Sequence, residues 1–449
     1  MIPSRDGALS ATLVFALAAV GLVAGLILGL RKGLPAAKAP AAAAAAEHSP
    51  ASRPGPSSEA GEARVYQRTH DLVMGSGYHS TAVFAPADDV KARAALAGAL
   101  QAALDCEKRI SKYDPESEVR RVWAAGPGDP VQVSADTFRA LELSVDLWKR
   151  SGGAFDCTVQ PLIDLYKFTG REERMPTDAE IAAARAKVGS DKLLLDPEKR
   201  TVALAAPGMK FDLGAVGQGL GADVACEALR KAGATGALVE IGGEVRAFGH
   251  KPDGSPWRIE VVHPRALDRR MAVVELDGNA VSTSGDYEKY FLTKEGGRQR
   301  EEGRRKKAEG RRQEAEGGGG APSPLAPPPS TLHLQPSPGP RRASHIIDPR
   351  TGKPLVGGAV SVTIIAPDCA LADGLATAVS VLGPVEGMKL VESYRAEGKA
   401  VEALIVEETA EGKLMPHLSP GLKDKLEVDL DVSVQYPAPA PAAAPAAGE

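Results

Sequence analysis

Cysteine is scarce in this sequence, and its spacing argues against two common classes of protein. The 449-residue chain has four cysteines, Cys106, Cys157, Cys226 and Cys369, with no CxxC pair and no histidine at ligand spacing. Neither a structural zinc site nor a small disulfide scaffold is indicated. One disulfide stays open for an exported protein, because pairing cannot be read from spacing alone.

Aromatic residues and an excess of one charge are also lacking. Phe, Trp and Tyr make up 4% of the chain, and 54 basic residues nearly balance 58 acidic ones, for a formal net charge of −4. No basic stripe interleaved with aromatic residues occurs outside the charged segment at 294–342. A nucleic acid is therefore not expected as the main partner.

Three stretches have no hydrophobic periodicity. Residues 39–64 are rich in Ala, Pro and Ser, residues 294–342 in charged residues, Gly and Pro, and residues 436–449 in Ala and Pro. Such stretches cannot bury enough apolar surface to fold, so we interpret them as a linker, an insert and a tail. The remainder of 65–435 suffices for one domain, plausibly of two packed halves.

One long hydrophobic run is present, at residues 9–30, LSATLVFALAAVGLVAGLILGL. It carries no charge, can cross a bilayer as a helix, and is longer than the apolar core of a usual signal peptide. Residues 1–38 are therefore predicted to be a membrane anchor, with a cleaved signal as the alternative. The flanking charges, Arg31, Lys32 and Lys38 against Arg5, by themselves favour a cytoplasmic catalytic part.

Strand-like and helix-like segments are mixed without a regular βαβ alternation. Extended segments are expected at 63–84 on both sides of MGSGYHS, and helices at 90–110 and 137–148. Further strands are expected in LLLD, TVALA, KFDLG and AVSVTIIAP and as a pair in GALVEIGGEVRAFG and WRIEVVHP; further helices are expected in GAVGQGLGADVACEALRKAG and LADGLATAVSVLGPVEGMKLVESY. The mixture predicts an α+β fold rather than a doubly wound sheet.

The segment FDLGAVGQGLGAD, residues 211–223, is a glycine-rich turn between an expected strand and an expected helix. Backbone N–H groups at a helix N-terminus can bind a phosphate. The spacing is not the usual GxGxxG frame, so a structural turn is an equal alternative. Asp212 precedes the turn, and the Ala215 carbonyl at the turn would be free to bind a hard cation.

Asp373 and Thr377, in LADGLATA, lie four residues apart and hence on one face of a helix. A carboxylate and a hydroxyl are suitable oxygen ligands for Mg²⁺ or Ca²⁺. Taken alone, however, the pair is more often a helix-terminal charge and a packed small residue.

Two further segments are ambiguous in isolation. His345, in SHIIDPRTG, would more often be a structural histidine, and its neighbour Asp348 is expected to cap the following turn. Ser284, Gly285 and Asp286, in TSGDYEKYF, are expected to form a tight polar turn after a strand.

These segments and their order closely resemble the ApbE family of FAD:protein FMN transferases. The matching pieces, between Met74 and Gly387, are MGSGYHS, SKYDPESEV, GGAFDCTVQPL, FDLGAVGQGLGAD, VEIGGEVRAFG, STSGDYEKYF, SHIIDPRTGKP and LADGLATAVSVLGPVEG. The resemblance implies an ApbE-like (T-fold-like) α+β domain of two packed α/β halves behind one N-terminal transmembrane helix. It also implies transfer of FMN from FAD to a Thr or Ser hydroxyl of an acceptor flavoprotein, with release of AMP.

The resemblance also assigns roles to individual residues. Those implied to line the FAD site or lie beside its phosphates are Met74, Tyr113, Ala154, Phe155, Asp156, Asp212, Gln218, Ser284, Gly285 and Asp286. Ala215, Asp373 and Thr377 would hold Mg²⁺, with Ca²⁺ or Mn²⁺ as alternatives, and His345 would be the base. Gln218 departs from the family, in which many members carry Lys, and the insert replaces a short hairpin.

The family resemblance places the catalytic domain outside the cytoplasm, anchored to the inner membrane by residues 1–38, against the weak charge bias. Two alternatives to transfer stay open. Hydrolysis of FAD to FMN and AMP uses the same residues, and a non-catalytic flavin-binding anchored protein would tolerate their loss. Because Asp212, His345, Asp373 and Thr377 are all present, we favour catalysis.

Overall fold

Antiparallel strand pairs and long helices build the computed structural model. It describes residues 62–166, 176–286, 290–294, 297–298, 341–409, 413–422 and 426–428. The predicted anchor and the tail at 436–449 lie outside the described residues, as does nearly all of the linker. The prediction of one domain over 65–435 therefore stays a prediction at its ends.

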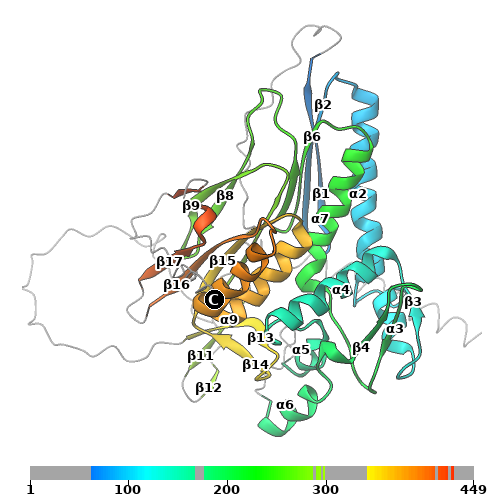
Figure 1. Ribbon diagram of the computed structural model, residues 1–449, viewed down its shortest axis with the longest axis vertical. Helices are drawn as coiled ribbons and strands as arrows, with labels where there is room; N and C mark the ends of the chain where they lie inside the picture. The colour runs from blue at the N-terminus through cyan, green and yellow to red at the C-terminus, as the bar shows by residue number, and fades with distance from the viewer. Residues whose placement is uncertain are drawn as a thin grey trace, which may run out of the picture. The chain divides into compact units, whose positions relative to one another are not determined.

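An eight-stranded sheet forms the centre of the described part (Figure 1), in the order β1-β2-β6-β7-β10-β15-β16-β17. Its strands are β1 (Arg64–Val73), β2 (Ser76–Phe84), β6 (Gly236–Ile241), β7 (Glu244–Phe248), β10 (Ala280–Gly285), β15 (Ala359–Ala366), β16 (Glu402–Glu408) and β17 (Leu414–Leu418). Every neighbouring pair is antiparallel. The prediction of an α+β fold over a doubly wound sheet is confirmed for this part of the chain.

Three smaller sheets surround the large one. Their strands, in spatial order, are β12 (Gly297–Arg298), β11 (Tyr290–Lys294), β13 (Arg341–Asp348) and β14 (Lys353–Val356); β18 (Leu426–Val428), β9 (Ala266–Leu276) and β8 (Trp257–His263); and β3 (Val131–Gln132), β5 (Thr201–Leu204) and β4 (Leu193–Asp196). The helices are α2 (Asp89–Ile110), α3 (Glu118–Ala124), α4 (Ala135–Arg150), α5 (Gln160–Tyr166), α6 (Asp178–Arg185), α7 (Gly214–Lys231) and α9 (Cys369–Ala396). Short 3-10 turns lie at η1 (Cys157–Val159), η2 (Ser190–Lys192) and η3 (Pro420–Leu422).

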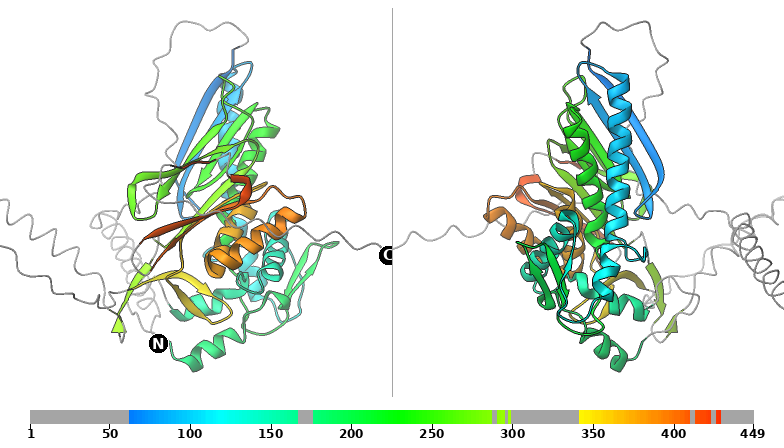
Figure 2. Two further views of the ribbon diagram at one scale, coloured as in Figure 1. Left: turned by 60° about the vertical axis from the view of Figure 1, so that its left-hand side comes forward. Right: turned by 90° about the vertical axis from the view of Figure 1, so that its right-hand side faces the viewer.

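Helices cover one face of the large sheet and the β8-β9-β18 sheet covers the other. Apolar side chains of α2 and α7 share one core with β1, β2 and β6, and α2 and α7 run side by side across these strands (Figure 2). Side chains of β8 and β9 share a second core with the opposite face. Alternate residues of a strand point to opposite faces of the sheet. Because both faces of the central strands are covered, both sets of side chains are apolar.

Helix α9 is the most buried long helix of the site region. Among the described helices it alone is long and apolar enough to cross a membrane, but 61% of its most apolar window is buried. Its side chains belong to the core shared with α4 and α7. Gly383, at φ 76°, breaks the helix in two before Pro384.

Some sequence-based expectations about elements were wrong. KFDLG is not a strand but an irregular segment leading into α7. WRIEVVHP forms β8, which pairs with β9 rather than with the β6-β7 hairpin. Ser284 and Gly285 are the last residues of β10, so only Asp286 lies in the turn. The ends of the predicted insert at 294–342 belong to strands β11, β12 and β13.

All four cysteines are buried and none forms a disulfide. Burial raises the pKa of the Cys106, Cys157 and Cys226 thiols to about 12. The pKa of Cys369 is raised well above its ordinary value, again chiefly by burial. The four thiols are thus held protonated inside the packed core.

Candidate active site

The glycine-rich segment at 211–223 forms the residues just before α7 and the first turns of that helix. α7 begins at Gly214, so Gly217, Gly219 and Gly221 lie inside the helix and are buried. A Cβ at Gly217 would come within 3.1 Å of the Ile110 side chain, and one at Gly219 would overlap the backbone carbonyl of Cys369. The glycines therefore let α7 approach its neighbours closely, which is the structural alternative of the sequence analysis.

At Gly219 the two helices α7 and α9 meet backbone to side chain. The Gly219 amide donates to the Asp373 carboxylate, with 3.1 Å between N and Oδ2. In a regular α-helix that amide would bond to the carbonyl four residues earlier, which is that of Ala215. The Gly219 amide thus donates a hydrogen bond to Asp373, and this is the amide that a regular helix would pair with the Ala215 carbonyl.

The Ala215 carbonyl faces α9. Its oxygen lies 3.8 Å from the point where a Cβ of Gly374 would stand, which is an ordinary contact distance, whereas that Cβ would overlap the Leu147 side chain. Asp373 is 6% exposed, and Thr377 is half-buried one turn further along α9. The structure therefore brings the Asp373 carboxylate and the Ala215 carbonyl to one seam between α7 and α9, with Thr377 one turn further along α9. Carboxylate, hydroxyl and carbonyl oxygens are the donor types that a hard cation takes. Among the described residues no group of three His, Cys, Asp or Glu side chains could hold a metal, consistent with a site that has one carboxylate.

Asp212 lies just before α7 and is bound by a lysine that the sequence analysis missed. The Lys112 ammonium is 2.7 Å from Asp212 Oδ2 and 3.0 Å from the Gln160 side-chain oxygen. Asp212 Oδ1 also accepts from the Gly214 amide at 2.9 Å. Lys112 directly precedes Tyr113, whose ring centroid lies 5.3 Å from its ammonium. The sequence signal that could have identified Lys112 was its position directly before Tyr113, a candidate FAD-site residue.

Met74 and Gln218 are brought together at the turn between β1 and β2. The Gln218 side-chain amide donates to Ser76 Oγ at 3.0 Å and to the Met74 carbonyl at 3.3 Å. Met74 itself has a φ of 52°, in the left-handed region. Gln218 thus ties this turn to α7 by two donated hydrogen bonds.

Three of the residues expected to line the FAD site are occupied with the fold itself. Ala154 and Phe155 are 1% and 3% exposed. The Asp156 carboxylate accepts from the amide and hydroxyl of Thr158 at 2.8 and 2.6 Å, and from those of Ser190 at 3.2 and 2.7 Å. Asp156 is therefore an anchor of the η1 and η2 turns. Tyr113, in contrast, is 83% exposed.

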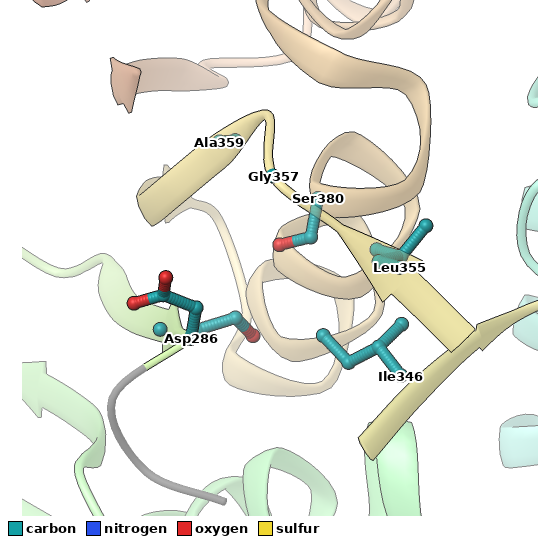
Figure 3. Close-up of a pocket in the computed structure, with 8 residues that line it drawn as sticks. Asp286, Ile346, Leu355, Gly357, Ala359 and Ser380 are labelled. Atoms are coloured by element: carbon teal, nitrogen blue, oxygen red, sulfur yellow. The ribbon is translucent and has the colours of Figure 1, made fainter. Parts of the chain in front are cut away.

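A small pocket lies where β10, β13, β14 and α9 meet (Figure 3). It is lined by Ser284, Gly285, Asp286, Ile346, Leu355, Gly357, Ala359 and Ser380. Figure 3 shows the Ser380 hydroxyl projecting from α9 toward the side of the pocket where Asp286 lies. Ser380 follows Thr377 by three residues, so the pocket and the candidate metal ligands neighbour each other along α9.

His345 is half-buried on β13, directly before Ile346, which lines the pocket. The register of β13 with β14 shifts between Ala343 and Ile347, so His345 lies within an irregular stretch of strand. The neighbouring Asp348 accepts from the Arg350 amide at 2.9 Å, which agrees with its expected capping role.

Asp286 is held by an arginine that the sequence analysis also missed. Arg265, between β8 and β9, binds both Asp286 oxygens at 2.7 and 2.9 Å and Glu408 at 2.7 Å. Although burial opposes it, the pKa of Arg265 is raised above its ordinary value by the hydrogen bonds to Asp286 and Glu408. No signal in the sequence pairs residues 265 and 286, because the contact crosses two sheets.

Comparisons with known proteins identify the family to which this chain is similar. The profile of the ApbE family matches residues 74–303 and 336–405. The FAD:protein FMN transferase of Haemophilus influenzae is 32% identical over 295 residues, 64% of this chain and 72% of that relative. The FAD:protein FMN transferase of Vibrio cholerae is 32% identical over 308 residues, 68% of this chain and 76% of that relative.

Solved structures show the same fold. The flavin transferase ApbE from Vibrio cholerae superposes with a TM-score of 0.62 at 28% identity, over 80% of this chain and 99% of that one. The flavinyl transferase ApbE of Pseudomonas stutzeri superposes with a TM-score of 0.61 at 30% identity, over 81% and 97%. With a family match over most of the chain and the same overall fold as solved ApbE structures, the chain belongs to the ApbE family.

Proposed function

We propose that this protein is a metal-dependent FAD:protein FMN transferase that moves FMN from FAD onto a Thr or Ser hydroxyl of an acceptor flavoprotein. The observation that supports the proposal most directly is the α7-α9 seam, where the Gly219 amide bonds to the Asp373 carboxylate and the Ala215 carbonyl faces α9. The activity named for the relatives from Haemophilus influenzae and Vibrio cholerae supports it.

The proposed reaction replaces the phosphoanhydride bond of FAD with a phosphoester to the acceptor. The acceptor oxygen forms a bond to the FMN phosphorus, the bond from that phosphorus to the AMP oxygen breaks, and AMP leaves with the electron pair. The hydroxyl proton passes to a base, which we assign to His345. FAD is the substrate rather than a resident cofactor.

Oxygen donors at the seam fit Mg²⁺ best among common cations, with Ca²⁺ or Mn²⁺ as alternatives. When bound, the cation would neutralise charge on the diphosphate of FAD. Asp373, fixed by the Gly219 amide, presents its carboxylate at the seam, and Thr377 adds a hydroxyl one turn later. In the first turn of α7, the Gly214 amide bonds to the Asp212 carboxylate and the Val216 amide to the Leu213 carbonyl.

For the remaining candidates we keep the assignments that the geometry supports. Met74, Gln218, Asp212 and the exposed Tyr113 surround the start of α7 and would contact FAD. The pocket of Ser284, Gly285 and Asp286 would receive the acceptor hydroxyl or lie beside the phosphates. Ala154, Phe155 and Asp156 would support the site from behind, since they are buried.

We further propose that residues 1–38 anchor the protein in the inner membrane with the catalytic domain outside the cytoplasm. The apolar run at 9–30 supports an anchor. Family membership, not the flanking charges, supports the orientation.

The test is a transfer assay with an internal alternative. Purified protein, FAD, Mg²⁺ and a candidate exported flavoprotein are incubated, and protein-bound flavin fluorescence is read in a denaturing gel. We expect labelling that EDTA abolishes and Mg²⁺ restores. Release of FMN and AMP without labelling would instead identify the protein as an FAD hydrolase, and full labelling after exhaustive chelation would refute the metal requirement.

A further inference from the structure

The α7-α9 seam continues beyond the candidate metal ligands to a buried carboxylate that neither the sequence analysis nor the proposed reaction uses. Asp223, on α7, is 7% exposed. Its two oxygens accept from the backbone amides of Cys369 and Ala370, at 2.9 and 3.1 Å. These are the first two amides of α9, which a helix leaves without partners of its own.

The contacts along the seam follow a fixed register. Asp223 meets Cys369 and Ala370, Gly219 meets Asp373, and the Ala215 carbonyl faces Gly374, one residue after Asp373. From Asp223 to Gly219 the position on α7 falls by four, while the contact on α9 moves forward from Cys369 and Ala370 to Asp373, so the two helices run antiparallel here. Asp223 makes the first of these contacts along the seam. The candidate metal donors Asp373 and Ala215 take part in the second and the third.

From this register we infer that Asp223 is a positioning residue for the metal site, which sets the axial alignment of α9 against α7 and thereby places Asp373 and Thr377 opposite Ala215. The inference rests on the proposed metal site. Asp223 does not touch the donors itself; it acts through the first turn of α9, to which they are rigidly connected.

Charged neighbours hold Asp223 in this role. The Arg139 guanidinium, from α4, lies 3.6 Å from Asp223 and 3.4 Å from Asp368, and Arg246 Nε from β7 lies 3.5 Å from Asp223. Two cations and two amide donors thus surround one carboxylate. Gly219 allows this close approach, because a Cβ there would overlap the Cys369 backbone.

Asp368 supplies a matched control. It caps the same helix end by accepting from the Leu371 amide at 3.0 Å, but it precedes α9 in the chain and makes no bond to α7. Loss of either carboxylate removes a helix cap and a partner of Arg139. Only loss of Asp223 removes the link between the two helices.

The experiment compares wild type, Asp223→Asn and Asp368→Asn as full-length proteins in the presence of FAD, with Mn²⁺ as the probe. Mn²⁺ affinity is measured by calorimetry, and hydrogen exchange is followed in peptides covering 369–376. We expect Asp223→Asn to weaken Mn²⁺ binding about tenfold and to speed exchange at the start of α9. Asp368→Asn should leave the Mn²⁺ affinity within about twofold of wild type.

Each other outcome has a defined meaning. Mn²⁺ affinity unchanged in Asp223→Asn, or lowered equally in Asp368→Asn, would overturn the inference, because general helix stability would then explain any effect. Failure of wild type to bind Mn²⁺ would overturn the proposed metal site and this inference with it. If Asp223→Asn does not fold, Arg139→Gln, at a half-exposed side chain, should weaken Mn²⁺ binding two- to threefold, and an unchanged affinity would overturn the inference.

Discussion

His345 is the side chain of the candidate site whose chemistry best suits removal of a proton from a hydroxyl. It lies on β13 beside the pocket residue Ile346. We expect His345→Ala to lower transfer by about two orders of magnitude while FAD affinity stays close to wild type. Gel fluorescence measures the first and fluorescence titration the second.

His79→Ala is the control for that variant. His79 lies on β2, with Nε2 3.1 Å from the Thr81 hydroxyl. Its removal should leave the transfer rate nearly unchanged. Equal losses of FAD affinity and transfer in His345→Ala would mean that His345 only shapes the pocket, and undiminished transfer would leave Asp286 or His79 as the next candidate.

Two residues that the resemblance assigns to the FAD site should behave oppositely. Asp156→Asn disturbs a carboxylate with four donors, so it should lower the free energy of unfolding by about 1–3 kcal/mol. Tyr113→Ala removes a side chain that is 83% exposed and should leave stability unchanged while weakening FAD binding. Denaturant unfolding and FAD titration of both variants check this, and a stable Asp156→Asn with lost FAD affinity would contradict it.

Asp223 should also give the stability a characteristic pH dependence. Burial, aided by the charge of Asp368, raises its pKa to about 6, against the opposing pull of the amides of Cys369 and Ala370. Since the folded state then holds the proton more tightly than the unfolded one, the contribution is present below about pH 4 and is lost as the pH rises through about 6. Relative to Asp223→Asn, wild type should lose up to about 3 kcal/mol of unfolding free energy across that window. A difference that is constant with pH would show that the amides keep Asp223 ionised.

At the scale of elements, the β11-β13 pair carries the insert. Thr293 on β11 pairs with Arg341 on β13, so the two ends of the connection are neighbours in a sheet. The family match pauses between 303 and 336, inside this connection. Deleting residues 304–335 leaves enough chain to join the strands, and long surface connections cost little entropy.

We therefore expect the deletion variant to fold and to retain most of its transfer activity. Its melting temperature should stay within a few degrees of wild type, and limited proteolysis of wild type should cut first within the deleted stretch. A variant that aggregates or loses the β11-β13 pairing would show that the insert stabilises the sheet.

The elements also show which parts of the fold are readable from sequence. Helices α2 and α4 were predicted, because each buries one face with a regular period. The strands of the β1-β2 hairpin were predicted from the extended segments on both sides of the glycine-containing turn. The helix predicted in GAVGQGLGADVACEALRKAG was confirmed as α7, and its glycines serve close helix packing, since helix propensity yields to tertiary contact. The candidate metal donors were assigned from the family resemblance of their motifs. Lys112, Arg265 and Asp223 were missed, because each contacts residues that are far away in the sequence and no local pattern connects the partners.

At the scale of the whole molecule, the N-terminal run bears on where the reaction takes place. Residues 1–38 lie outside the described part of the structure, so the anchor stays a prediction. The full-length protein should sediment with membranes, while a variant starting at residue 39 should stay in the supernatant and transfer FMN at a similar rate. Full-length protein in the supernatant would refute the anchor, unless its N-terminus proves to have been cleaved.

The buried cysteine thiols allow local opening of the protein to be measured without an added label. Cys369 is the first residue of α9, and its amide bonds to Asp223 of α7. Cys157 lies in η1, away from the α7-α9 seam. A thiol reagent can modify either only when the surrounding packing separates, so the reaction rate counts openings rather than contacts. If Cys369 reacts faster than Cys157, its reaction rate would measure how often α7 and α9 separate in the wild-type protein.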